Sequence, residues 1–164
     1  MYEMIFRAAT EADTDECLKI YASAREFMRQ SGNPTQWSGE YPGREDIEKD
    51  LKLGHAFVVE DMGEVVGVCH FHVGADPTYE VIEGGAWLND DDFGVIHRIA
   101  VRDRMRGVAR FIYDECFKVI PNIKIDTHED NLPMKRSLEG AGFVSCGIIY
   151  VLDPQPRVAY QKAK

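Results

Sequence analysis

Segments with strand and helix periodicity alternate along this chain, and their order constrains its fold more than any other feature. Apolar side chains recur at helical spacing over residues 11–30 and again over 107–119. Between them, residues 55–61 and 64–73 flank a short turn ending in Gly63, which predicts a β-hairpin. The chain therefore combines paired strands with amphipathic helices.

The remaining segments complete this order. Further strands are expected at 4–9, 95–101, 123–126, 143–152 and 157–161, and further helices at 44–53 and 131–140. An acidic loop covers 74–92, and loops of this length in compact domains are usually functional. The order predicts an α/β fold in which a mixed sheet carries helices on both faces.

Length and charge narrow the possible functions. The 164 residues suit one domain, 1–164, because domains commonly contain about 100–200 residues. Acidic residues outnumber basic ones by 28 to 19, which gives a net charge of −9. This charge repels phosphate backbones, so nucleic acid is not an expected partner, whereas a cationic amine is compatible. Solubility alone would also account for the charge.

Targeting and redox features favour the cytoplasm. The first ten residues carry Glu3 and Arg7 and lack the apolar stretch of a signal peptide. No window approaches the ~18 apolar residues of a membrane span, so no membrane association is expected. The cysteines lie apart from one another in apolar runs, as buried reduced thiols do. They are Cys17, Cys69, Cys116 and Cys146.

The segment from Ile99 to Arg110 carries the clearest chemical signal. It runs from a strand through a basic turn into a helix, with the pattern Arg104-x-x-Gly107-x-Ala109. A helix begins with unpaired amides and partial positive charge, and small residues let an anion approach them. The pattern therefore suits a pyrophosphate, although an ordinary basic helix cap fits it equally well. It matches neither a P-loop nor G-x-G-x-x-G.

A second segment favours the pyrophosphate site over an ordinary helix cap. Asn131 opens a helix that closes before Gly142-Phe143. With the pattern at 97–110 and the run 125–143, the chain resembles the GNAT superfamily of N-acetyltransferases over nearly its whole length. The resemblance implies a mostly antiparallel sheet of about six or seven strands. It implies acetyl transfer from acetyl-CoA directly to a primary amine of a small molecule or peptide, and it is compatible with a homodimer.

The resemblance also implies a coenzyme A site. The strand Ile99-Ala100-Val101 would pair its backbone with the pantetheine arm, an amide near Val101 would stabilise the thioester oxygen, and Asn131 would contact the pantetheine. The phosphates would lie on the turn formed by Arg104, Arg106, Gly107, Val108, Ala109 and Arg110.

Acetyl transfer needs a group that takes the amine proton, and His97 is the candidate base. Arylalkylamine N-acetyltransferases, which this part of the chain resembles, place a proton-relaying histidine similarly, and histidine accepts protons near neutral pH. The alternative is a buried histidine bonded to a neighbouring carbonyl.

The general acid is missing from its usual position. Many members of the superfamily carry a tyrosine seven residues after the asparagine, where this chain has Leu138. His128 and Tyr150 are candidate acids, although His128 also suits a helix cap and Tyr150 a packed side chain. Alternatively the thiolate leaves unassisted, or the chain is a non-catalytic acyl-CoA-binding or regulatory module.

Two further groups of residues are candidates for binding the acceptor amine or a metal ion. Tyr79, Glu83 and Trp87 offer aromatic walls and a carboxylate for an ammonium group, or they pin the long loop to the core. Trp37 is expected to be structural. His70 and His72 alternate along one strand face, but two more ligands would be needed, so no metal is expected.

Overall fold

The computed structural model describes residues 3–152 and 154–164 of the chain. Its strands are β1 (Ile5–Ala8), β2 (Ala56–Asp61), β3 (Glu64–Val73), β4 (Gly94–Val101), β5 (Asn122–Thr127), β6 (Val144–Tyr150) and β7 (Pro156–Ala163). They form one sheet in the order β1-β2-β3-β4-β5-β7-β6. All neighbours are antiparallel except β4 and β5. The mixed, mostly antiparallel sheet that the sequence predicted is confirmed.

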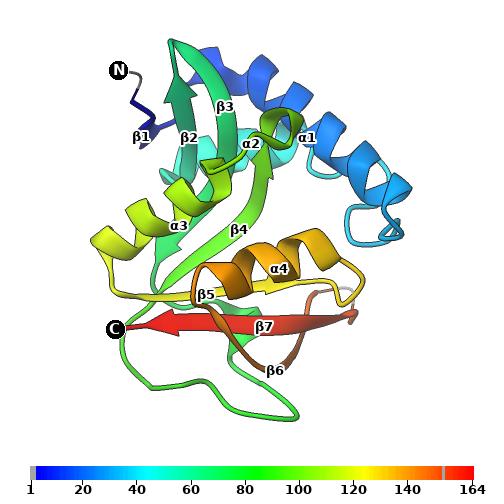
Figure 1. Cartoon of the computed structure of the whole chain (residues 1–164), viewed down its shortest axis with the longest axis vertical. Helices are drawn as coiled ribbons and strands as arrows, with labels where there is room; N and C mark the ends of the chain where they lie inside the picture. The colour runs from blue at the N-terminus through cyan, green and yellow to red at the C-terminus, as the bar shows by residue number, and fades with distance from the viewer. Residues whose placement is uncertain (1–2, 153) are drawn as a thin grey trace.

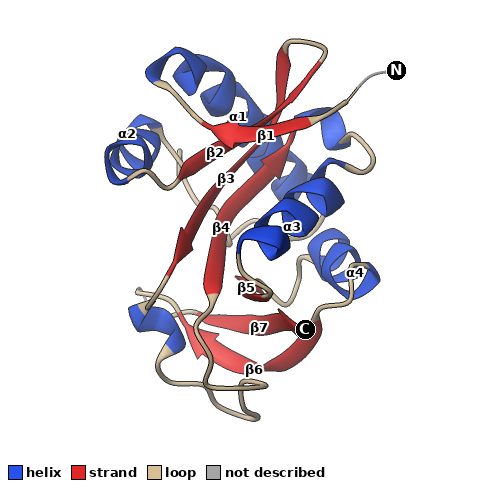
Figure 2. Cartoon of the chain, turned by 90° about the vertical axis from the view of Figure 1, so that its left-hand side faces the viewer, coloured by secondary structure: helices blue, strands red, loops and turns tan. Residues whose placement is uncertain are grey.

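The helices are α1 (Thr14–Gln30), α2 (Arg44–Leu53), α3 (Val108–Val119) and α4 (Leu132–Gly140). They cover both faces of the sheet, with α1 and α2 on one and α3 and α4 on the other (Figures 1 and 2). Strand alternation explains this, because neighbouring residues point to opposite faces. Val58 packs in the core beneath α1, and Val59 packs in the core beneath α3.

The first helix begins later than its periodicity suggests. Glu11–Asp13 form a 3₁₀ turn, and α1 starts at Thr14. The buried Asp13 carboxylate accepts from the Thr10 amide at 2.8 Å and from two nitrogens of Arg7. The hydrogen bond from Arg7 lowers the pKa of Asp13 despite burial. These bonds hold β1 against the start of α1.

The two halves of the sheet separate between β4 and β5. These strands pair only at Gly94 with Ile123 and at Val95 with Lys124. Beyond this point they diverge, as Figures 1 and 2 show from two directions. β4 also carries an irregularity in its pairing with β3, where Arg98 has a φ of 47°. The side of β4 that faces β5 is therefore free of a strand partner after Val95 in the described structure.

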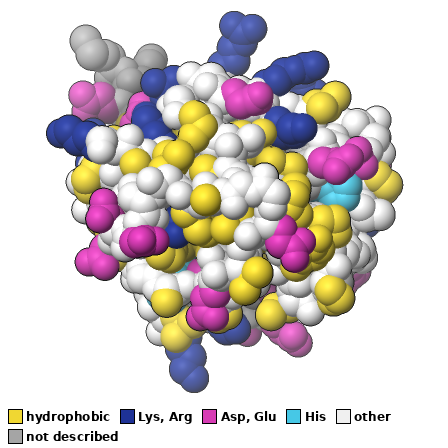
Figure 3. All heavy atoms as spheres, turned by 90° about the horizontal axis from the view of Figure 1, so that it is seen from below, with side chains coloured by type: hydrophobic (Ala, Val, Ile, Leu, Met, Phe, Trp, Pro, Cys, Tyr) yellow, Lys and Arg dark blue, Asp and Glu magenta, His cyan; other side chains and the backbone are white. Residues whose placement is uncertain are grey.

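The long loop between β3 and β4 is pinned to the C-terminal half of the sheet. Glu83 exchanges backbone hydrogen bonds with Ile148, and the Trp87 indole donates to the Tyr79 carbonyl at 3.0 Å. Tyr79 packs on the core formed with Val95, Ile149 and Ala159. Figure 3 shows one end of the molecule, where acidic, basic and apolar side chains are interspersed.

Two expectations concern burial and membranes. All four cysteines are free and buried, as the sequence predicted. Within the described ranges, no helix combines the length and the apolar character needed to cross a bilayer.

Gly67 sets how closely α3 approaches β3. A Cβ at this position would lie 2.8 Å from Val108 Cγ1 and 3.4 Å from Ile112 Cδ1. We expect Gly67→Ala to lower the free energy of unfolding by about 1–3 kcal/mol through overpacking, measured by urea denaturation. Gly140→Ala is the control, because a Cβ there meets nothing within 4 Å and favours the helix. Equal stability of both variants would contradict this packing.

Candidate functional site

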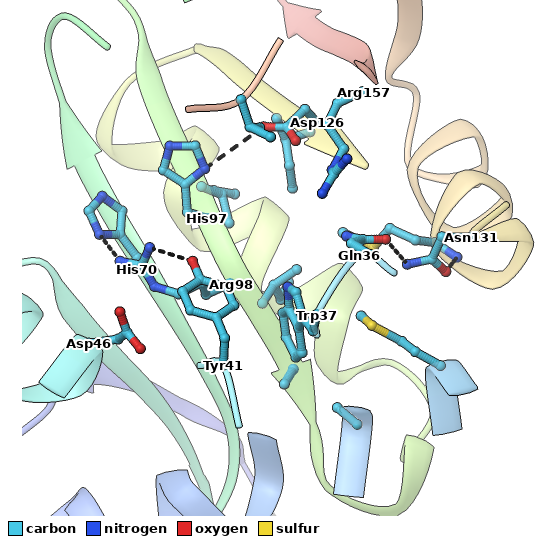
Figure 4. A pocket seen from close by; sticks show the side chains of 18 of the residues that line it. Gln36, Trp37, Tyr41, Asp46, His70, His97, Arg98, Asp126, Asn131 and Arg157 are labelled. Carbon is cyan, nitrogen blue, oxygen red and sulfur yellow. Dashed lines mark hydrogen bonds and ion pairs between the residues drawn. The ribbon is translucent and has the colours of Figure 1, made fainter. Parts of the chain in front are cut away.

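A cleft of about 1500 Å³ lies where β4 and β5 diverge. Its lining includes residues of α1, the α1–α2 loop, α2, β3, β4, β5 and α4 (Figure 4). The predicted pantetheine strand Ile99-Ala100-Val101 lines it, as do the base candidate His97 and the asparagine Asn131. Divergence of the strands therefore brings together residues that the sequence separates by more than thirty positions.

His97 points into this cleft from β4 and is held between two carboxylates. Its Nε2 donates to Asp76 Oδ2 at 2.6 Å, and its Nδ1 lies 3.9 Å from Asp126 Oδ2. The side chain is 24% exposed, so a ligand can reach it. The hydrogen-bond partner of His97 is therefore a carboxylate. A purely structural histidine is expected to bond a neighbouring backbone carbonyl.

Asp76 is itself fixed. Its other oxygen, Oδ1, accepts from the Thr78 amide at 2.9 Å and from the Thr78 hydroxyl at 2.6 Å. Burial works to raise the pKa of the Asp76 carboxyl, but hydrogen bonds from His97 and Thr78 outweigh it and hold that pKa well below its usual range. Asp76 is thus an anion at neutral pH that orients the His97 ring.

Tyr79 acts on the site through Asp126. Its hydroxyl donates to Asp126 Oδ2 at 2.7 Å, and the side chain is buried. Burial raises the pKa of Tyr79 well above its usual value, and the Asp126 charge adds to this effect. Tyr79 therefore serves as a neutral donor behind the cleft wall, while its predicted contact with an acceptor stays a prediction.

A second charged group lies beside His97. Arg98 Nη2 bonds both oxygens of the buried Asp50, at 2.7 and 2.8 Å, and Arg98 also donates to the Tyr41 hydroxyl. Asp50 Oδ1 lies 2.9 Å from His70 Nδ1. Burial would raise the pKa of Asp50, but the bonds from His70 and Arg98 lower it. Burial lowers the pKa of His70 to about 4, so this imidazole is neutral at pH 7.

The predicted phosphate turn has the expected backbone. Gly107 has a φ of 85° and precedes α3, and the Phe111 amide donates to the Gly107 carbonyl. Helix geometry leaves the amides before Phe111 without intrahelical partners. Arg104 and Ala109 line the cleft, and the Arg104 guanidinium stacks 4.3 Å from the centre of the Phe27 ring.

The other side chains of the turn do not line the cleft. Val108 is buried and offers only its backbone. Arg106 is exposed, and Arg110 binds Asp114 and the Gly140 carbonyl. Their predicted phosphate contacts stay predictions, and for Arg110 they require release from Asp114.

Asn131 is anchored as a helix cap. Its Oδ1 accepts from the Met134 amide, and its Nδ2 donates to Gln36 Oε1 at 3.0 Å. Gln36 Oε1 also accepts from Asn33 and from the His128 amide. Gln36 therefore ties the α1–α2 loop to the start of α4, a role that the sequence gave no signal for.

The two candidate acids lie outside the cleft lining, and so do all three acceptor candidates, including the buried Tyr79. His128 Nδ1 accepts from the Asp130 amide, as the capping interpretation expected. The Tyr150 hydroxyl donates to the exposed Glu83 at 3.1 Å. The Trp87 ring packs 4.3 Å from Lys124 Nζ. Trp37 is buried against Tyr21, as expected of a structural residue.

A scan against protein-family models finds no match, and a search of curated proteins finds none either. Solved structures do match. A GNAT-family acetyltransferase from Streptococcus agalactiae 2603 is 31% identical, over 98% of this chain and 95% of its own, with a TM-score of 0.89. The chain therefore belongs to the GNAT family of acetyltransferases.

More distant structures share the fold. A GNAT-family acetyltransferase from Listeria monocytogenes 4b F2365 is 22% identical over 97% of this chain and 94% of its own, with a TM-score of 0.69. A chain from a structure of the NatC complex bound to Gag peptide and CoA is 14% identical over 99% of both chains, with a TM-score of 0.57.

The lowered pKa of the Asp76 carboxyl predicts how the free energy of unfolding depends on pH. Such a carboxylate stabilises the fold above its ordinary pKa, near 3.9, and the contribution is lost as the pH falls through the lower folded value. We expect Asp76→Asn to lower the free energy of unfolding by about 1–3 kcal/mol at pH 7.

The difference from the unsubstituted protein should shrink as the pH is lowered below about 4. Urea titrations across this range measure it. Asp92→Asn, an exposed aspartate of the same loop, is the control and should change little. If the free energies of unfolding of Asp76→Asn and the unsubstituted protein differed by the same amount at all pH values, the lowered pKa of Asp76 would be contradicted.

Proposed function

We propose that this chain transfers an acetyl group from acetyl-CoA to a primary amine of a small molecule or peptide, by direct attack when both are bound. The observation that carries the proposal is the His97–Asp76 pair, which lies in the cleft between diverging strands of an acetyltransferase fold. We propose further that residues 1–164 act as one domain and that the protein works in the cytoplasm.

The residues that line the cleft fit coenzyme A. The free edge of β4 at Ile99-Ala100-Val101 offers backbone groups for an amide-containing arm. The amides of the first turn of α3, beside Gly107 and Arg104, suit a pyrophosphate. Support comes also from the shared fold of the NatC structure, which is bound to CoA. When bound, the cofactor supplies the acetyl group as an activated thioester.

His97 takes the proton of the attacking amine in this proposal. Its Nε2 is committed to Asp76, so Nδ1 is the nitrogen that accepts. Asp76 holds the ring in this tautomer and stabilises the imidazolium that forms, as the aspartate of a catalytic triad does. Asp126, held by Tyr79, adds a second negative charge within 3.9 Å.

The leaving thiolate lacks a tyrosine donor at the usual position. Leu138 is fully buried in the core beneath α3 and α4. Neither His128 nor Tyr150 lines the cleft, and His128 Nδ1 is occupied by the Asp130 amide while Tyr150 is bonded to Glu83. We therefore propose that the thiolate departs without a dedicated side-chain acid. Leu138 is also the observation that favours the second candidate, a non-catalytic acyl-CoA-binding or regulatory module.

The acceptor end of the cleft suits an ammonium group. Asp46, Asp76 and Asp126 line it with carboxylates, while Arg98 is neutralised by Asp50. Tyr79 acts through Asp126 in this proposal. Glu83 and Trp87 shape the loop that carries Asp76, so their effect on acceptors is indirect.

Replacement of His97 tests the mechanism. With an amine that the unsubstituted protein acetylates, His97→Gln should lower kcat by roughly 10²–10⁴-fold because the base is lost. The KM for acetyl-CoA should stay within about twofold, since His97 lies away from the phosphate turn. The measurement is thiol release from acetyl-CoA.

His128→Gln is the matched control, and it should retain activity because His128 lies outside the cleft lining. An unchanged kcat in His97→Gln would rule out His97 as the base. Tight acetyl-CoA binding without turnover across a broad amine panel would favour the non-catalytic module.

A further inference from the structure

Three histidines converge on the wall of the cleft next to His97. They are His55, His70 and His72, and one ring nitrogen from each lies within 4.8 Å of the other two. All three line the cleft, and the His70 ring centre is 5.3 Å from that of His97. The sequence pattern indicates only His70 and His72, because His55 lies fifteen positions before His70 along the chain.

The β2–β3 hairpin produces this cluster. His70 and His72 alternate on β3, so both point to the same face. His70 pairs with Ala56, the first residue of β2, and the Phe71 amide donates to the His55 carbonyl at 2.8 Å. The register therefore fixes His55 beside the other two rings before any ligand binds.

The hydrogen bonds behind two of the rings resemble those behind metal-ligating histidines. His70 Nδ1 faces Asp50 Oδ1 at 2.9 Å, and His72 Nε2 faces the Ala75 carbonyl at 3.2 Å. Both partners can only accept, so they favour a proton on these outer nitrogens. A carboxylate or carbonyl behind each imidazole is the arrangement that orients metal ligands.

The inner nitrogens are then left with lone pairs that face each other. His70 Nε2 and His72 Nδ1 are 2.6 Å apart. His55 Nδ1 is buried and has no hydrogen-bond partner among the described residues. A cation between the rings would satisfy the inner nitrogens of His70 and His72 and could take one ring nitrogen of His55 as a third ligand.

One arrangement without metal competes. Arg98 Nη2 lies 3.0 Å from His70 Nδ1. If Arg98 donated to that atom, His70 would carry its proton on Nε2 and donate to His72. Asp50 would then face a lone pair at 2.9 Å, which is unfavourable. Arg98 already bonds both oxygens of Asp50, which favours the first arrangement.

We propose that His55, His70 and His72 bind one divalent transition-metal ion, with Zn²⁺ the best-suited ion, through three imidazole nitrogens. Neutral imidazoles suit zinc, copper and nickel. Zinc–nitrogen bonds of about 2.0–2.1 Å place two tetrahedral ligands about 3.4 Å apart. The His70–His72 nitrogens, 2.6 Å apart, must separate, and any pair wider than about 3.4 Å must close, by small side-chain rotations; all three nitrogens already lie within 4.8 Å of one another.

The fourth position of the site opens to the cleft. Water fills it, or an electron-pair donor of a bound acceptor does, which would place that molecule beside His97. This proposal does not rest on acetyl transfer, because the three ligands and their hydrogen bonds lie apart from the phosphate turn.

Calorimetric titration of the chelator-treated protein, residues 1–164, with Zn²⁺ tests the site. We expect one ion per chain with a Kd in the micromolar range or below at pH 7.5, and a rise in Tm on binding. Co²⁺ should give the absorption bands of a tetrahedral nitrogen site.

His72→Ala is the main variant, since this side chain is only half-buried and its loss should leave the fold intact. It should weaken Zn²⁺ binding by at least about 100-fold, and His55→Ala should do the same. His128→Ala, which removes a histidine outside the cluster, should bind as the unsubstituted protein does.

No binding tighter than millimolar, or equal binding by folded His72→Ala, would overturn the proposal. Circular dichroism without metal confirms folding of each variant. Because the titration contains no acetyl-CoA, a failure of acetyl transfer would leave its result unchanged, and the two proposals fail separately.

Discussion

The separation of β4 from β5 after two residue pairs is the constraint on which the rest of the structure depends. Strands in a sheet normally satisfy each other's backbone groups, and a free edge inside a domain must find other partners. Here the free edge forms one wall of the cleft. The starts of α3 and α4 lie at its two sides, because each helix follows one of the diverging strands (Figure 1).

Polar groups in the cleft are held by partners from distant segments. Asp76 comes from the long loop, Asp126 from the end of β5, and Asp50 from α2. Each carboxylate is bonded on at least one side to a buried or half-buried donor, so its orientation is fixed. His97, His70 and His72 consequently face the cleft with one ring nitrogen each already hydrogen-bonded. Such preorganisation is what catalytic and metal sites share.

The sequence predicted the fold well because local periodicity determines element type. Every strand and helix appears in the predicted order, and the main local error, at 11–13, arises because Asp13 binds Arg7 and Thr10. Within the site, the β4 segment and the turn from Arg104 to Ala109 could be predicted from the sequence, because each is contiguous and together they carry a recognisable pattern.

Contacts between segments that are distant in sequence could not be predicted. Nothing near His97 in sequence indicates Asp76 or Asp126, and only the hairpin register brings His55 to His70. The sequence indicates Tyr150 and Glu83 as functional residues with separate roles, whereas in the structure they are bonded to each other outside the cleft lining. An aspartate that stands before a proline in a loop, as Asp76 does before Pro77, indicates at most a local turn, and Asp76 does cap a 3₁₀ turn.

Hydrogen exchange of backbone amides with and without coenzyme A tests the central claim most directly. If the free edge of β4 and the first turn of α3 hold the cofactor, exchange should slow at 99–101 and 106–110, with little change in the distant β1–β2 pair. Unchanged exchange at both segments under saturating coenzyme A, or protection confined to another surface, would contradict the account.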